Sequence, residues 1–262
     1  MLAYEEVELA LHEVGKTSAR KRHGLAPYTS SPLPLVVRTW NLYHGRTKPN
    51  SGRTYLERMV RLASEGADLV ALQEVPSWAL GRLEAWSGAT VFGAVARPAR
   101  LGALGRKLTA LAPDILRSAL NGQANALLVR APLRAEGGQR IVELRATGQL
   151  ERRVCQLVRV GAGERAFVVA NLHATAHAPE RAREEVDRVA ELVRGEEAAI
   201  VCGDFNVRAL GLPDFSPPIR GIDQILVRGL GFEQEPATWK PERRAVGPNL
   251  LSDHAPVEAV VA

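Results

Sequence analysis

Six short polar segments in this sequence lie at the ends of apolar runs. They are Thr39–Asn41, Leu72–Val75, Asn171–His173, Gly203–Asn206, Ile222–Ile225 and Leu251–Val257. Each carries Asn, Asp, Glu or His, the residue types that bind cations, contact phosphate or transfer protons. One polar strand end means little, but six in one chain predict strands that deliver their side chains to a common pocket.

Asp204 and Asn206 give the sharpest local signal, because they follow the apolar run Ala198–Cys202 and then Gly203. We expect Gly203 to permit a tight turn, and an extended chain would place both polar side chains on one face. A carboxylate beside a neutral amide suits a water nucleophile: Asp204 accepts or orients its proton, and Asn206 binds the water or a phosphate. The alternative is an Asx turn that only closes the strand.

Glu74 ends a second apolar run, where a carboxylate is costly unless it is hydrogen-bonded or bound to a metal. A few hard oxygen ligands completed by water suit Mg²⁺ or Mn²⁺. The alternative role of Glu74 is to cap a helix that starts at Pro76.

Three further residues could form an acid and imidazole pair: Asp223 precedes an apolar run, and Asp253 and His254 precede the last one. A carboxylate fixes an imidazole tautomer and supports its charged form, so His254 could act as a base or as a donor to a phosphoryl oxygen. His173 follows another strand in the same way. A lone histidine is more often a surface residue, so each needs the others for support.

Other common catalytic motifs do not occur in the sequence. No Cys or His cluster has zinc-site spacing, and neither GxGxxG nor GxxxxGK[ST] is present. Ser252 is not in a nucleophile elbow, which argues against an acyl-transfer triad. Carboxylates, amides and histidines without an activated nucleophile indicate metal-assisted attack of water on phosphorus.

The pattern from Leu35 onward predicts an α+β domain. Strands are expected at 35–40, 68–72, 90–95, 124–129, 140–145, 154–160, 166–170, 198–201, 224–227 and 256–261, and helices at 54–65, 76–86, 101–120 and 179–194. Many successive strands with few helices favour two facing sheets with helices outside. We expect residues 34–262 to form one domain and residues 1–33 to form a basic, mobile extension.

Composition indicates which class of partner the protein binds and which cell compartment it occupies. The net charge of +5 favours an anionic partner such as nucleic acid, although a generally basic surface is the alternative. Between Trp86 and Arg134 the only acid is Asp114, against seven Lys or Arg residues. Cys155 and Cys202 are expected to be reduced core thiols, and the N-terminus does not look like a secretory signal, so we expect a cytoplasmic protein without a membrane segment. No protein partner is inferred.

The ordered motifs Thr-Trp-Asn, Leu-Gln-Glu-Val, Gly-Asp-Phe-Asn and Ser-Asp-His-Ala-Pro-Val resemble those of the endonuclease/exonuclease/phosphatase superfamily, which has the deoxyribonuclease-I-like fold. The resemblance covers essentially all of 35–262. It implies a four-layer αββα sandwich with two mostly antiparallel sheets, and phosphoester hydrolysis with a divalent metal, usually Mg²⁺.

The resemblance also implies roles for individual residues. The metal side would hold Glu74 as direct ligand with Asn41 and Asp253. Asp204 and Asn206 would position or activate water, Asp223 would hold His254 against phosphate, and His173 would be a further phosphate-binding histidine. Asn171, Arg46 and Trp239 are candidate substrate contacts. The alternative for Trp239 is an ordinary loop tryptophan. The segment containing His44 and Arg46 departs from the family pattern.

A metal-dependent phosphodiesterase, specifically a nuclease acting on DNA or RNA, is the favoured function. The low aromatic fraction of 5% disfavours stacking on single strands and suits contact with a duplex backbone. The first alternative is a phosphatase or phosphodiesterase for a small phosphoester such as an inositol phosphate or lipid headgroup. The second is an inactive binding protein on the same fold.

Overall fold

The first sheet is built around the strand that carries the first motif. The computed structural model describes residues 34–99, 120–145 and 152–262. In it, the sheet has the order β12-β15-β1-β3-β5-β4. These strands are β12 (Phe232–Thr238), β15 (Val257–Val261), β1 (Leu35–Asn41), β3 (Leu69–Val75), β5 (Gln123–Val129) and β4 (Thr90–Arg97). Strands β1 and β3 are parallel, and the other neighbours are antiparallel.

The second sheet has the order β11-β10-β9-β8-β6, and β7 also pairs with β8. Its strands are β11 (Asp223–Arg228), β10 (Ala199–Asp204), β9 (Arg165–His173), β8 (Arg153–Ala162), β6 (Arg134–Ala135) and β7 (Arg140–Arg145). Strands β9 and β10 form its one parallel pair among these neighbours. A small third sheet joins β13 (Ala245–Val246), β14 (Asn249–Leu251) and β2 (Thr47–Lys48).

Alternation along the strands sorts the apolar residues into separate layers. Leu69 and Ala71 of β3 face the second sheet, in one core cluster with residues such as Val169 and Ile200. Their neighbours Val70 and Leu72 face outward into a different cluster. Burial on both faces explains why β3 reads as a continuous apolar run rather than an alternating one.

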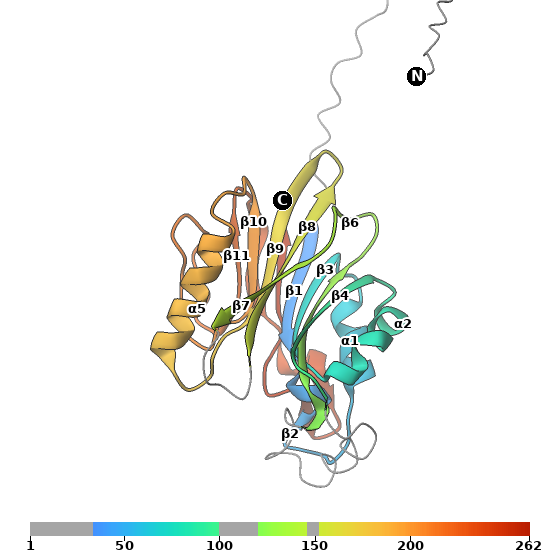
Figure 1. Ribbon diagram of the computed structural model, residues 1–262. Helices are drawn as coiled ribbons and strands as arrows, with labels where there is room; N and C mark the ends of the chain where they lie inside the picture. Colours follow the sequence, from blue (N-terminus) through green and yellow to red (C-terminus); the bar gives the residue numbers. More distant parts are fainter. Residues whose placement is uncertain (1–33, 100–119, 146–151) are drawn as a thin grey trace, which may run out of the picture. The chain divides into compact units, whose positions relative to one another are not determined.

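Helices cover the two outer faces, which completes four layers (Figure 1). Helices α1 (Leu56–Ser64) and α2 (Leu83–Ser87) pack on the first sheet, and α5 (Pro179–Leu192) packs on the second. Residues such as Met59 of α1 and Val186 of α5 are fully buried in these contacts. The expected αββα sandwich with two mostly antiparallel sheets is confirmed. Within the described residues, no helix is long and apolar enough to cross a membrane.

One predicted helix differs from the structure, and two predicted segments lie outside it. The chain after Pro76 forms a 3₁₀ helix, η2 (Ser77–Arg82), and only then the short α2, instead of one helix over 76–86. Gly81 lies inside η2 and lowers helix propensity, and Gly88 ends α2 in the left-handed conformation, at φ 66°. Most of the helix expected at 101–120 and the extension 1–33 fall outside the described residues.

Strand β12 was not predicted, for a clear physical reason. It lies at the edge of the first sheet, and most of its residues are exposed or half-buried. Its sequence contains Pro236 and has no apolar alternation, and its pairing with β15 shifts register twice. Proline and bulges are tolerated at sheet edges, where one side of the strand needs no hydrogen-bonded partner.

Candidate active site

The polar strand ends meet at one end of the sandwich, where β2 lies in Figure 1. Strands β1 and β3 are parallel and end at Asn41 and near Glu74, and β9 and β10 are parallel and end at His173 and Asp204. The antiparallel partner β11 begins at Asp223, directly opposite Asp204. Parallel pairing therefore explains why residues far apart in sequence arrive together.

Imidazoles and carboxylates alternate in a continuous row through this site. His44 Nε2 lies 3.6 Å from Glu74 Oε2, and Glu74 Oε1 lies 4.0 Å from His173 Nε2. His173 Nε2 lies 3.6 Å from Asp204 Oδ2, which lies 3.8 Å from His254 Nε2. His254 Nδ1 then binds Asp223 Oδ2 at 2.9 Å. The row joins both sheets through their side chains.

Asp204 is almost completely buried, at 1% exposure. Its Oδ2 accepts a hydrogen bond from Asn41 Nδ2 at 3.0 Å, and its Oδ1 accepts one from the Asn206 backbone N–H at 3.0 Å. Burial and the charge of nearby Asp223 raise the pKa of Asp204 to about 7 despite these hydrogen bonds and the opposing charge of His254. A carboxylate with a pKa near neutrality is suited to act as a general base.

Contrary to the sequence expectation, Asn206 does not continue the extended strand. Strand β10 ends at Asp204, and Asn206 adopts a left-handed φ of 53°. Its Nδ2 donates to the Ala174 carbonyl at 2.9 Å, which ties the Asp204 turn to the end of β9. The Asx-turn alternative is thus correct as local geometry, and the same turn leaves Asp204 within the site.

Gly203 lies inside β10 and is needed for close strand packing, not for a tight turn. A Cβ at this position would lie 2.0 Å from the Leu172 carbonyl oxygen on β9, and its φ of 138° disfavours other residues. Leu172 and Gly203 are register partners, one position before His173 and Asp204. The glycine therefore sets the closeness of the two strands that carry these groups.

His254 is held as a cation. Burial lowers its pKa, but the hydrogen bond and charge of Asp223, with the charges of Asp204 and Asp253, raise the pKa to about 10. Its backbone is fixed as well: the His254 N–H donates to Ser252 Oγ at 3.0 Å, and its carbonyl accepts from Trp40 Nε1 at 3.0 Å. A fixed imidazolium is suited to stabilise negative charge on a phosphoryl oxygen.

The surroundings of His173 lower its pKa, in contrast to those of His254. Burial lowers its pKa well below the ordinary value, and Arg153, His254 and His44 lower it further. Gln123 Nε2 donates to His173 Nδ1 at 2.9 Å, because an amide nitrogen can only donate. The neutral ring therefore carries its proton on Nε2, which faces Glu74 and Asp204.

Backbone strain gathers at the same end of the sandwich. Eight non-glycine residues in the described chain have positive φ, and five of them belong to the site segments: Tyr43, His44, Glu74, Asn206 and Ser252. Such conformations cost on the order of 1–3 kcal/mol each and persist where the surrounding structure imposes them. Their concentration at this end supports a functional role for it.

The segment that contains the site residues matches a known family. The model of the Endonuclease/Exonuclease/phosphatase family matches residues 39–254, which run from the β1 motif to the last histidine. The chain belongs to this family. A search of the curated proteins finds no match.

Solved structures share the fold of this family member at low sequence identity. An endonuclease/exonuclease/phosphatase from Beutenbergia cavernae DSM 12333 is 18% identical, with a TM-score of 0.65, over 87% of this chain and 71% of that one. A functionally unknown conserved protein from Enterococcus faecalis V583 is 17% identical, with a TM-score of 0.65, over 87% and 99%. Truncated TDP2 from Caenorhabditis elegans is 14% identical, with a TM-score of 0.61, over 87% and 97%.

The donor set fits a divalent cation. Asp204, Asp223 and His254 offer ligand atoms that all lie within 4.8 Å of one another. Asp223 is already bound to charged His254, however, so this trio is first a hydrogen-bonded network. Glu74 lies outside this trio, with 21% of its side chain exposed and its two oxygens 3.6 and 4.0 Å from the imidazoles of His44 and His173. Buried and half-buried oxygens gathered in this way suit a hard or borderline cation.

Three of the candidate substrate contacts lie in other surroundings than expected. Asn171 is fully buried and links the two sheets: its Nδ2 donates to the carbonyls of Leu72 and Ala126 at 3.2 and 3.0 Å, and its Oδ1 accepts from Gln73 Nε2 at 2.8 Å. Direct substrate contact does not fit that position. Arg46 is also buried, and its carbonyl accepts from the Ser252 N–H at 2.8 Å.

Trp239 is packed rather than presented for stacking. The ring is 5% exposed, and the guanidinium groups of Arg243 and Arg38 lie 3.7 and 5.0 Å from its centroid. Its Nε1 donates to Glu258 at 3.2 Å. The alternative of an ordinary loop tryptophan is the one that the structure favours. Asp253, in contrast, is exposed and lines a cavity of about 250 Å³ together with Asp223, His254 and Arg208.

Sequence reasoning gave no role to four residues that support the site. Ser252 Oγ donates to the Asn41 carbonyl at 2.6 Å while accepting from His254, so it joins the first and last motifs. Gln123 and Arg153 lie beside His173 Nδ1, at 2.9 and 3.4 Å, and His44 lies beside Glu74. Only Ser252 and His44 stand next to recognisable motifs, so only these two had a local signal.

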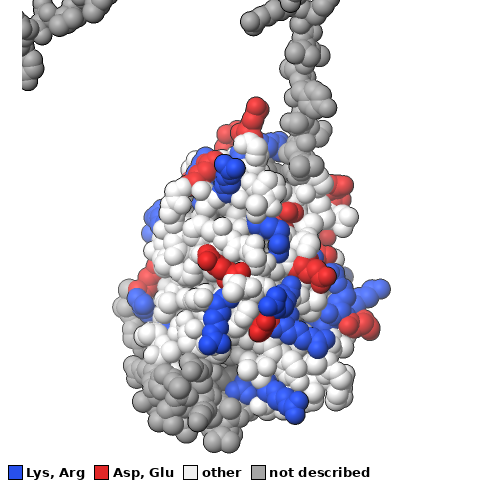
Figure 2. Space-filling view, turned by 90° about the vertical axis from the view of Figure 1, so that its right-hand side faces the viewer, with Lys and Arg blue, Asp and Glu red and all other residues white. Residues whose placement is uncertain are grey.

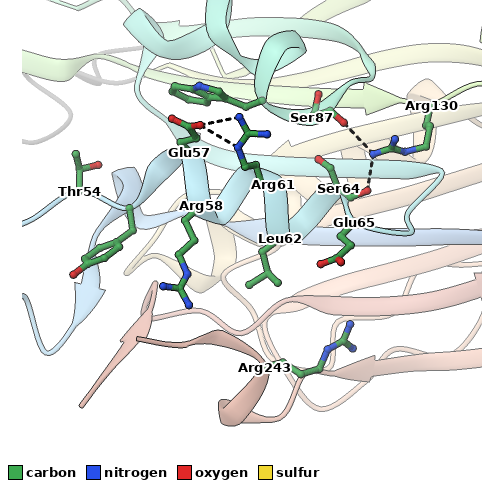
Figure 3. A pocket seen from close by; sticks show the side chains of 12 residues that line it. Thr54, Glu57, Arg58, Arg61, Leu62, Ser64, Glu65, Ser87, Arg130 and Arg243 are labelled. Carbon is green, nitrogen blue, oxygen red and sulfur yellow. Dashed lines mark hydrogen bonds and ion pairs between the residues drawn. The ribbon is translucent and has the colours of Figure 1, made fainter. Parts of the chain in front are cut away.

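Another cavity lies away from this chemistry. Its volume is about 790 Å³, and α1, the end of α2, Arg130 and Arg243 line it (Figure 3). Arg61 pairs with Glu57 on the exposed surface of α1, whereas Arg130 donates to the carbonyls of Ser64, Ala67 and Ser87 and so links α1 to the end of α2. Figure 2 shows acidic and basic side chains intermixed on this face. The cavity contains none of the row of imidazoles and carboxylates.

Proposed function

We propose that this chain is a divalent-metal-dependent phosphodiesterase that cleaves nucleic acid. The observation that carries the proposal is the pairing of buried Asp204, with its pKa raised to about 7, and His254, whose pKa is raised to about 10. Near neutral pH this arrangement offers a proton acceptor, Asp204, and a cation whose Nε2 lies 3.8 Å from Asp204 Oδ2. That combination suits attack of water on a phosphodiester.

In the proposed reaction, Asp204 accepts a proton from the attacking water as the oxygen bonds to phosphorus and the P–O bond to the leaving group breaks. Asn41 and the Asn206 backbone N–H hold the carboxylate through its two oxygens. The His254 cation, held by Asp223, stabilises charge on a phosphoryl oxygen. Neutral His173 donates a hydrogen bond from its Nε2–H to a phosphoryl oxygen, and the departing oxygen takes its proton from solvent.

Glu74 is the proposed direct ligand of the cation, Mg²⁺ or Mn²⁺. Asn41 and Asp253 are the further metal-side residues that the resemblance implies. When bound, the cation would offset phosphate charge and polarise a phosphoryl oxygen. Glu74 fits this role because its carboxylate is half-buried and lies within 4.0 Å of the imidazoles of His44 and His173.

Nucleic acid is the proposed substrate class because the chain is basic overall, at +5, and Arg208 is exposed beside the Asp223 and His254 cavity. We also propose that residues 34–262 act as one domain in the cytoplasm. The cytoplasmic location is supported by the free thiols of Cys155 and Cys202, both buried as expected. Burial raises the pKa of Cys202 to about 12, so that thiol is unreactive.

The test is hydrolysis with Mg²⁺, Mn²⁺ or EDTA on plasmid DNA, abasic-site duplex, RNA, inositol phosphates and bis-p-nitrophenyl phosphate. Wild type should cut a polynucleotide only with metal, and Asp204→Ala should lose at least about 100-fold, the scale of a lost acid–base group. Asp187→Asn, an exposed acid on α5, is the matched control and should keep full activity. Activity on small esters alone would assign the phosphatase alternative. A folded, active Asp204→Ala protein would refute the mechanism.

A further inference from the structure

His44 is held in the site by a loop that has little freedom. Residues Tyr43, His44 and Gly45 have φ values of 49°, 52° and 81°, three consecutive left-handed residues. Gly45 is required here, because a Cβ would lie 2.7 Å from Thr54 Oγ1 and 2.8 Å from Leu56 Cβ. The expected motif Thr-Trp-Asn ends just before this loop, so nothing in the proposed reaction yet uses the imidazole.

Hydrogen bonds fix the loop at both ends. The Tyr43 N–H donates to Asn41 Oδ1 at 3.0 Å, and the Tyr55 N–H donates to the Gly45 carbonyl at 2.7 Å. Beyond it, the Ser252 N–H donates to the Arg46 carbonyl at 2.8 Å. The loop is therefore attached to the Asn41 motif, to the start of α1 and to the segment that carries His254.

The fixed imidazole is directed at the carboxylate of Glu74. His44 is 5% exposed, and its Nε2 lies 3.6 Å from Glu74 Oε2, too far for a good hydrogen bond. Two ligands bound to one ion at about 2.1 Å lie roughly 3.0–3.4 Å apart, close to this separation. Glu74 also has a left-handed φ, of 51°, so strained backbone presents both groups to each other.

We propose that His44 donates its Nε2 lone pair to the cation that Glu74 binds, giving this metal site a nitrogen ligand. The inference rests on the proposed function, in which Glu74 is the metal-side carboxylate. Imidazole favours transition-metal ions, whereas a shell of oxygens alone favours Mg²⁺. The site therefore prefers Mn²⁺ to Mg²⁺, and His44 is the residue responsible for that preference.

The decisive experiment measures binding of Mn²⁺ to the full chain without substrate, by electron paramagnetic resonance. Pulsed measurements should show ¹⁴N coupling to Mn²⁺ in wild type and its loss in His44→Asn. Asparagine is the chosen replacement because it adopts left-handed φ readily and should preserve the loop. We also expect His44→Asn to weaken Mn²⁺ affinity at least tenfold while Mg²⁺ affinity, from competition, changes less than threefold.

Two further variants separate this role from others. His177→Gln replaces an exposed histidine and should keep the ¹⁴N coupling. His173→Gln removes the other imidazole next to Glu74 and should also keep it. Coupling that survives in His44→Asn, is absent from wild type, or disappears only in His173→Gln would overturn the proposal. If His44→Asn does not fold, His44→Gln replaces it. Because no substrate is present, failure of the proposed hydrolysis would leave these results readable.

Discussion

At the scale of single residues, Asp204 is placed for chemistry at a cost in stability. Burial raises its folded-state pKa from 3.8 to about 7, so the folded protein pays to ionise it at neutral pH. A raised pKa destabilises the fold progressively as pH rises from 3.8 to 7, and the penalty is constant above that. The shift corresponds to roughly 4 kcal/mol when the carboxylate is fully ionised.

Asp204→Asn should therefore be more stable than wild type at pH 8 in EDTA, although inactive. The amide loses one of the two accepted hydrogen bonds, so we expect a net gain of about 1–2 kcal/mol. The gain should shrink or reverse at pH 5, where the folded wild type holds the proton. Urea unfolding at both pH values measures it, with Asp187→Asn as the exposed control. A difference that does not vary with pH would contradict the raised pKa.

At the scale of elements, the contact between β9 and β10 sets the geometry of His173 and Asp204. Gly203→Ala should force these strands apart, because the new Cβ would meet the Leu172 carbonyl at 2.0 Å. We expect a loss of about 3 kcal/mol or more in unfolding free energy, together with a fall in activity. Gly195→Ala is the matched control, since nothing lies within 4 Å of its Cβ position. Thermal and urea unfolding measure the effect. A Gly203→Ala protein as stable as Gly195→Ala would contradict this packing.

The same elements show what the sequence could and could not predict. Apolar runs located the strands that end at Asn41, Glu74, His173 and Asp204, because burial on both faces leaves a strong signal. The apolar runs do not reveal which strands lie opposite one another. The hydrogen bond from Asn171 to the Ala126 carbonyl on the other sheet was therefore not predicted. Edge strand β12 and the supporting contacts of Gln123 and Arg153 depend on tertiary neighbours, which no local pattern encodes.

At the scale of the whole molecule, the site was found through its ordered motifs, whereas the substrate depends on charge spread over the surface. The basic stretch between Trp86 and Arg134 supports nucleic acid less than its composition implied. Four of its basic residues, Arg100, Arg106, Lys107 and Arg117, lie outside the described residues, and Arg130 is committed to three backbone carbonyls. Arg208 is the exposed cation that lines the cavity beside the site.

Salt dependence should decide between a polynucleotide and a small ester. Binding of duplex DNA by inactive Asp204→Ala should weaken steeply between about 50 and 200 mM salt, because each phosphate contact contributes a log–log slope of about −0.9. Arg208→Ala should reduce the magnitude of that slope by about one, whereas Arg183→Ala on the exposed face of α5 should leave it unchanged. Fluorescence anisotropy of a labelled duplex measures both. A weak slope that Arg208→Ala does not alter would mean that no extended phosphate backbone is bound, and would favour the small-phosphoester alternative.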